Sequence, residues 1–173
     1  MLAIAALPTH DTPSGSSLAV RNQRGCETGE CPGGNTNSFI ADTLVLMADG
    51  STRRIVDVSP GDQISATDPA TGVTTAQPVV ATIVGTGSKD LVEITSDAGL
   101  LTATSNHRFW VANRGGWHTA AELAVGDLLG EAGELRVAGL RTTTRPATVY
   151  NLDVTGPQTF TLQVSGRQVL VHE

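Results

Sequence analysis

The chain has 173 residues, a length that suits one domain with one sizeable core. Its formal charge of -6 argues against nucleic acid or an anionic membrane surface as a partner. Phosphate binding needs clustered Lys and Arg, and the eleven in this chain are scattered. No apolar run approaches the roughly 20 residues that span a bilayer, so we expect no membrane segment.

The first 37 residues are interpreted as a flexible flanking segment. Met1 to Leu7 are apolar, but no basic segment precedes them and Pro8 follows, so we do not interpret them as a signal peptide. Residues 9–37 are dominated by Gly, Ser, Thr, Pro and Asn and show no apolar period of 2 or 3.6. Such a stretch buries too little apolar surface to order itself.

Cys26 and Cys31 are the only cysteines, and both lie in this segment. The turn-forming residues around them would let the thiols meet in a local disulfide, and two free thiols are the other interpretation. Tetrahedral zinc would need two more thiolate or imidazole ligands, and the sequence has no second cysteine pair. We therefore expect no metal.

From Ser38 onward the composition changes to short β-rich runs separated by turn signals. Thr43–Met47, Val79–Val84 and Leu91–Thr95 are examples, each followed closely by Gly or by a Gly-containing turn. Helical periodicity appears only over Thr119–Leu123, which is too short for the crossover helix of a parallel sheet. The predicted class is all-β.

One turn pattern occurs twice in this part of the chain. Val58-Ser-Pro-Gly61-Asp62-Gln-Ile64 recurs as Leu123-Ala-Val-Gly126-Asp127-Leu-Leu129. Each copy has Gly-Asp three residues after an aliphatic side chain and just before a predicted strand. An internal duplication and two unrelated turns of similar sequence both explain the pattern.

Four blocks, taken together and in this order, resemble the sequence blocks of Hint (hedgehog/intein) domains. They are Ser38-Phe-Ile-Ala-Asp-Thr43 with the following strand and Gly61-Asp62, Leu101-Thr-Ala-Thr104-Ser-Asn-His107-Arg-Phe109, Val149-Tyr150-Asn151-Leu-Asp153-Val154 with Thr159-Phe160, and Val169-Leu-Val171-His172.

The resemblance covers residues 38–173 and implies a compact, pseudo-twofold β-domain of the Hint fold. Residues 1–37 then correspond to the flanking segment that inteins call the N-extein. The chain is most similar to bacterial intein-like and pretoxin Hint domains, which process secreted, multidomain polypeptides. A place in a secreted or cell-surface bacterial polypeptide is therefore implied.

The resemblance also implies roles for four residues, which should lie close together in the fold. Ser38 would attack the preceding carbonyl and turn the Asn37–Ser38 amide into an ester that water opens more readily. His107 would protonate the amide nitrogen as general acid. Thr104 would orient the scissile amide and bind developing charge. His172 would belong to the C-terminal cleavage machinery, and no cofactor is implied.

Four positions depart from the family pattern. Ser38 stands where the family usually has Cys, and its hydroxyl is a weaker nucleophile because it stays protonated near neutral pH. Asn151 stands where many inteins have Asp, and Gln158 where intein-like relatives often have His. Glu173 follows His172 where the family has a cyclising Asn, and no residue follows it. We therefore expect neither C-terminal release nor complete splicing.

We expect a single-turnover autoprocessing monomer that cleaves its own Asn37–Ser38 bond, with its flanking polypeptide as substrate. The alternative is a catalytically silent Hint scaffold that serves as a spacer or interaction module in a secreted, toxin-type protein. A metal- or nucleotide-dependent enzyme is not supported, since no phosphate-binding Gly-rich loop precedes a Lys. His10 lies in the flanking segment and His118 follows Trp117 in a predicted turn, so neither receives a catalytic role.

Overall fold

The computed structural model describes residues 37–173. In this part of the chain the regular structure is antiparallel strand, with two 3-10 turns and no α-helix. The turns are η1 (Ile55–Asp57) and η2 (Ala120–Glu122). The predicted all-β class is therefore confirmed, and the short helical periodicity over Thr119–Leu123 produces only η2. Cys26 and Cys31 lie outside the described residues.

Fourteen strands follow one another along the described chain. They are β1 (Phe39–Ile40), β2 (Leu44–Leu46), β3 (Thr52–Arg54), β4 (Gln63–Asp68), β5 (Val73–Gly85), β6 (Ser88–Ser96), β7 (Leu100–Thr104), β8 (Arg108–Val111), β9 (Gly116–Thr119), β10 (Leu128–Leu129), β11 (Leu135–Pro146), β12 (Val149–Val154), β13 (Thr159–Val164) and β14 (Arg167–His172).

Each predicted run corresponds to a strand, and the prediction for His118 is corrected. Thr43–Met47 contains β2, while Val79–Val84 and Leu91–Thr95 belong to β5 and β6. His118 was expected in a turn and is instead paired with Phe109 inside β9. The two glycines before Trp117 look like a turn signal, but the second of them already belongs to the strand.

The strand order has an internal twofold pattern, as the Hint resemblance predicts. The order is β3-β2-β13-β14-β8-β10-β11-β6-β7-β1-β12-β5-β4, with β9 paired to β8 outside this path. In the sheet, β4-β5-β12-β1 mirrors β10-β11-β6-β7, and β3-β2-β13 mirrors β9-β8-β14 once the pairing of β9 with β8 is included. The pseudo-twofold axis therefore passes where β1 pairs with β7 and where β13 pairs with β14.

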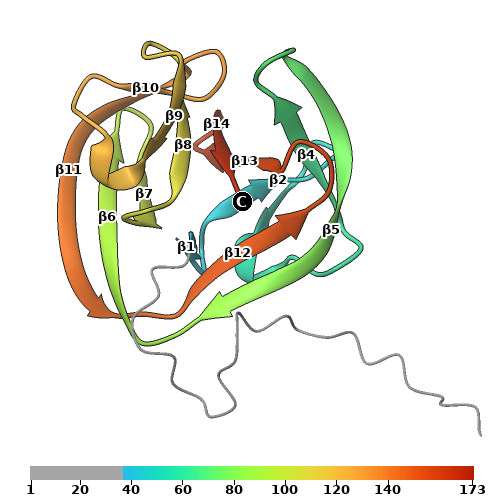
Figure 1. Ribbon diagram of the computed structural model, residues 1–173, viewed down its shortest axis with the longest axis horizontal. Helices are drawn as coiled ribbons and strands as arrows, with labels where there is room; N and C mark the ends of the chain where they lie inside the picture. Colours follow the sequence, from blue (N-terminus) through green and yellow to red (C-terminus); the bar gives the residue numbers. More distant parts are fainter. Residues whose placement is uncertain (1–36) are drawn as a thin grey trace, which may run out of the picture.

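The two halves are tied together by exchanged strands. The long strand β5 pairs with β12, and its counterpart β11 pairs with β6, so each half completes its sheet with a strand of the other. Figure 1 shows the β6–β11 pair on one side of the molecule and the β5–β12 pair on the other, with β13 and β14 between them. The C-terminal end of β14 lies near the centre (Figure 1).

The two Gly-Asp turns have the same backbone geometry. Gly61 and Gly126 adopt left-handed φ angles of 93° and 98°, which glycine tolerates without strain. The amide of Gly61 donates to the carbonyl of Val79, and that of Gly126 to the carbonyl of Val137, both at 2.8 Å. This matched geometry supports the duplication over two unrelated turns.

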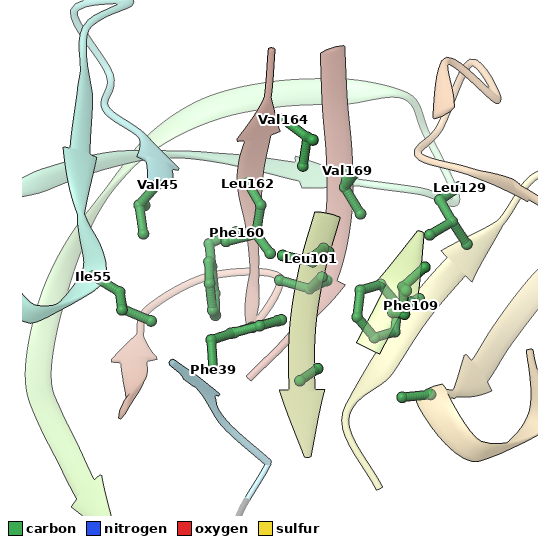
Figure 2. Packing of buried hydrophobic residues seen from close by; sticks show 14 of the residues in the cluster. Phe39, Val45, Ile55, Leu101, Phe109, Leu129, Phe160, Leu162, Val164 and Val169 are labelled. Carbon is green, nitrogen blue, oxygen red and sulfur yellow. The ribbon is translucent and has the colours of Figure 1, made fainter. Parts of the chain in front are cut away.

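The apolar core is built around three phenylalanines. Phe39 on β1 meets Phe109 on β8 and Phe160 on β13 edge to face, with ring centroids 6.0 and 6.2 Å apart. All three rings are fully buried, and Figure 2 shows them together with Leu101. Each such contact is worth about 0.5–1.5 kcal/mol beyond the burial of the rings. Because Phe39 follows Ser38 directly, this core fixes the backbone at the predicted nucleophile.

No helix within residues 37–173 is long and apolar enough to cross a membrane.

The two turn carboxylates should differ in their contribution to stability. Asp127 accepts from the amide of Ala124 at 2.8 Å and pairs with Arg114, and its side chain is 6% exposed. The side chain of its counterpart Asp62 is 25% exposed. We expect Asp127→Ala to lower the free energy of unfolding by about 2 kcal/mol and Asp62→Ala by about 1 kcal/mol, because the hydrogen bond lost at Asp127 is partly buried whereas the bond from the Ser59 amide to Asp62 is exposed.

Urea denaturation at neutral pH measures both changes. The control is Asp42→Ala, since the side chain of Asp42 is 80% exposed and its removal should alter stability by less than about 0.5 kcal/mol. Equal losses at Asp62 and Asp127 would contradict the role of burial.

Candidate functional site

Ser38 and Thr104 are joined directly across the pairing of β1 with β7. The Ser38 amide nitrogen donates to Thr104 Oγ1 at 3.0 Å, and the Thr104 amide donates to the Ser38 carbonyl at 2.9 Å. Both residues are fully buried. The nitrogen in the first bond belongs to the Asn37–Ser38 amide, so the Thr104 hydroxyl holds the peptide bond that the sequence predicts to be scissile.

His107 is brought beside this peptide bond by a turn that follows β7. Its amide donates to the Thr104 carbonyl at 3.0 Å, which closes the Thr-x-x-His segment. The imidazole is fully buried and lies 4.1 Å from the ring of Phe39 between centroids, with Phe109 at 5.7 Å and Phe160 at 6.5 Å. The three core phenylalanines thus surround the ring.

This environment lowers the pKa of His107 from its ordinary value of 6.5 to about 3. Burial is the main cause, because it penalises the charged imidazolium, and the positive charge of His172 adds to it. The Asn37 backbone acts in the opposite direction and raises the pKa. Neither ring nitrogen makes a well-aligned hydrogen bond within residues 37–173. His107 is therefore neutral at neutral pH.

His172 occupies the last position of β14, where its backbone pairs with Thr159 on one side and Arg108 on the other. Its Nδ1 lies 3.1 Å from the Glu173 carbonyl oxygen, and its ring centroid lies 5.4 Å from that of Trp117. The ring is partly exposed, unlike that of His107. Ser38, Thr104 and His107 thus lie together where β1 meets β7, whereas His172 lies at the end of β14, which pairs with β13 and β8.

Glu173 is held by three contacts. Its amide donates to the Gln158 carbonyl at 3.0 Å, and its carboxylate accepts from the Val154 amide at 2.6 Å. The third is the approach of His172 to its carbonyl oxygen. Burial raises the pKa of the Glu173 carboxyl, and the neighbouring Asp153 adds to the rise. Position 173 therefore retains a defined place in the fold although Glu replaces the family's Asn.

Asn151 lies opposite Ser38, the predicted nucleophile, across the pairing of β1 with β12. Phe39 pairs with Tyr150, so the register continued by one residue brings Asn151 opposite Ser38, on the strand edge away from Thr104. Residues directly opposite in an antiparallel pair share a face of the sheet. The Asn151 side chain is 4% exposed, and its Oδ1 accepts no hydrogen bond within the described residues. In the sequence, Asn151 differs from the Asp of many inteins, but no local pattern places it beside Ser38.

His118 does not contact the four predicted residues through any ring interaction seen in residues 37–173, and His10 lies outside them. No cluster of three or more His, Asp or Glu side chains able to hold a metal ion occurs between residues 37 and 173.

An antiparallel pseudo-twofold domain, with a buried Thr-x-x-His segment on the peptide bond before its first strand, defines the class of Hint-fold, intein-like domains. The family model of the pretoxin Hint domain matches residues 44–173. The chain belongs to this family.

Solved structures share the fold. A bacterial intein-like domain from Clostridium thermocellum is 30% identical with a TM-score of 0.71, and the match covers 80% of this chain and 99% of that one. A DnaB intein from Synechocystis is 23% identical with a TM-score of 0.63, covering 79% and 98%. At that identity the second match shows the fold alone. Comparison with curated protein sequences gives no match.

Asn151 should carry a stability penalty. A buried acceptor without a partner costs about 1–3 kcal/mol relative to its solvated state, whereas an apolar side chain of similar size costs nothing of this kind. We expect Asn151→Leu to raise the free energy of unfolding by about 1 kcal/mol in urea denaturation. Asn151→Asp is the matched comparison and should lower it at neutral pH, because it buries a charge. A clear loss of stability in Asn151→Leu would contradict the unpaired state of Oδ1.

The low pKa of His107 should make the fold sensitive to acid. The unfolded chain binds a proton at this ring below pH 6.5, whereas the folded protein binds it only near pH 3. The stability linked to neutral His107 is therefore complete above pH 6.5 and is lost progressively between pH 6.5 and about 3, by at most about 1.4 kcal/mol per pH unit.

His107→Gln isolates this contribution because glutamine does not titrate. The difference in free energy of unfolding between the parent and His107→Gln, measured by urea denaturation, should fall as the pH is lowered from 7 to 4. A constant difference over this range would mean that the ring titrates alike in both states.

Proposed function

We propose that this domain cleaves its own chain at the Asn37–Ser38 bond through an acyl shift from nitrogen to oxygen. The observation that carries the proposal is the hydrogen bond of the Ser38 amide nitrogen to Thr104 Oγ1 at 3.0 Å, beside the buried ring of His107. Membership in the pretoxin Hint family and similarity to a bacterial intein-like domain support an autoprocessing reaction.

The reaction balances without a cofactor. Ser38 Oγ attacks the Asn37 carbonyl carbon and loses its proton, and the carbon–nitrogen bond then breaks as the Ser38 nitrogen gains one. One proton thus moves from oxygen to nitrogen, and an ester replaces the amide. Water then opens the ester, which leaves a carboxylate on Asn37 and restores the hydroxyl of Ser38.

His107 supplies the proton that the leaving nitrogen needs. An amide nitrogen is a poor leaving group until it is protonated, and a positioned acid contributes about 10²–10⁴-fold to such a step. Burial lowers the pKa of His107 to about 3, so the ring is neutral at neutral pH. It can donate a proton to the Ser38 nitrogen only after a neighbouring group has protonated it. We assign this task to His172, because its backbone pairs with Arg108, the residue that follows His107, and because its positive charge contributes to the lowered pKa of His107.

The substrate in this proposal is the domain's own flanking polypeptide, and the acting unit is a monomer within a secreted bacterial protein of the toxin type. We assign no C-terminal cleavage to Glu173. The reaction at that position in the family uses the side-chain amide nitrogen of Asn, and a carboxylate has none.

A silent Hint scaffold remains the second candidate, and the burial of Ser38 favours it. Ser38 is fully buried, so water must enter the site before an ester can be opened. In this alternative the domain serves as a spacer or interaction module, and the Asn37–Ser38 bond persists.

Replacement of the nucleophile tests the proposal. Ser38→Cys should raise the rate of cleavage, since a thiol provides more reactive anion at neutral pH and forms a thioester that added thiols intercept. Ser38→Ala should abolish cleavage, and His107→Ala should slow it by about 10²-fold or more in both the Ser38 and Cys backgrounds. Intact-mass measurement during prolonged incubation, with and without hydroxylamine, detects a product that begins at residue 38.

His118→Ala is the matched histidine control and should cleave at the parent rate. A chain that stays intact in the Ser38→Cys variant with added thiol, or unchanged cleavage in His107→Ala, would overturn the proposal and favour the silent scaffold.

A further inference from the structure

Trp117 lies against the ring of His172 at the partly exposed side of the site. The ring centroids are 5.4 Å apart and the planes meet at 89°, an edge-to-face contact. Trp117 is paired on its own hairpin with Trp110, whose ring lies 5.4 Å away at 76°. The three rings, from β8, β9 and β14, form a continuous edge-to-face series.

The fold itself does not require an aromatic residue at this place. In the pseudo-twofold arrangement β3 is the counterpart of β9, because each pairs as an outer strand with β2 or β8 respectively. The counterpart strand consists of Thr52, Arg53 and Arg54, all exposed. The fold therefore forms this outer strand without an aromatic side chain in β3, which does not pack on His172. Of these two strands, an aromatic residue is present only in β9, where Trp117 contacts His172.

The ring of His172 needs a side-chain contact to fix its orientation. Pairing with Thr159 and Arg108 fixes the backbone of His172 but does not determine which rotamer its side chain adopts. The approach of Nδ1 to the Glu173 carbonyl at 3.1 Å is one restraint, and it favours the tautomer in which Nδ1 carries the hydrogen. The indole of Trp117 is the other restraint, since it packs perpendicular to the imidazole.

We propose that Trp117 is a positioning residue that holds His172 with Nδ1 on the Glu173 carbonyl, so that Nε2 serves His107. The inference rests on the proposed function. In that reaction the imidazolium of His172 passes its Nε2 proton toward His107 and returns to the Nδ1–H tautomer, and His107 passes a proton to the Ser38 nitrogen. His172 then takes a proton back from water, which is balanced by the proton that Ser38 Oγ releases to water. Trp117 takes no part in the proton transfer and acts only through the orientation of the His172 ring.

A double-mutant cycle tests this dependence. We expect Trp117→Leu to slow cleavage about tenfold through a misplaced proton-transfer group, and Trp117→Phe to restore most of the rate because it retains an aromatic ring. In a His172→Ala background, Trp117→Leu should have no further effect, since a residue that acts through His172 has nothing left to position. Additive losses would overturn the proposal.

Trp110→Leu is the matched control on the same hairpin. It removes a tryptophan that contacts Trp117 but makes no ring contact with His172 among the described residues. We expect it to cleave within about twofold of the parent, while thermal denaturation checks that both leucine variants are folded at the assay temperature. An equal loss of rate in the two variants would mean that the hairpin is merely structural.

A second measurement separates this proposal from the cleavage reaction itself. The ¹⁵N shifts of histidine-labelled Ser38→Ala protein report which nitrogen of His172 carries the hydrogen, and cleavage does not disturb them. We expect the Nδ1–H form in this parent, and a mixture of tautomers once Trp117→Leu is added. An unchanged tautomer would overturn the inference even if cleavage occurs, whereas a shifted tautomer in a chain that never cleaves would contradict only the proposed function.

Discussion

The hydrogen bond between the Ser38 amide and the Thr104 hydroxyl joins residues that are 66 positions apart in the chain. It forms where β1 meets β7, next to the aromatic core that begins with Phe39. Neither partner is exposed, so water does not compete for the bond, and an electrostatic contact is stronger in such surroundings than in solvent. The peptide bond before Ser38 is therefore held in one orientation relative to Thr104 and the ring of His107.

The same burial that holds this peptide bond limits the chemistry around it. Phe39, Phe109 and Phe160 enclose His107, and the resulting loss of solvation lowers its pKa to about 3. A buried neutral imidazole can act as an acid only after it takes up a proton from a neighbouring group. His172 is partly exposed, and its backbone pairs with Arg108, the residue that follows His107. His107 is thus buried and close to the Ser38 peptide bond, whereas His172 is partly exposed to solvent.

The two halves of the domain share a scaffold and differ where the chemistry lies. The Gly61-Asp62 and Gly126-Asp127 turns make equivalent backbone hydrogen bonds, and the exchanged strands give each half the same sheet order. The symmetry ends at the outer strands, since β9 carries Trp117 against His172 while β3 carries only exposed polar residues. Duplication explains the matched strands and turns of the two halves. The contact of Trp117 with His172 has no equivalent at β3, so it distinguishes one half from the other.

The sequence by itself determined the all-β class and the two Gly-Asp turns. Through the Hint resemblance it also identified the four candidate site residues. Gly-containing turns and short β-rich runs each depend on a few neighbouring residues, so the sequence alone reveals them. The same local reasoning misplaced His118, because Gly115 and Gly116 look like a turn although β9 has begun. Only the tertiary structure decided that Asn151 lies opposite Ser38 and that Trp117 packs on His172. These neighbours depend on strand register and ring packing between distant segments, which are set by the core as a whole.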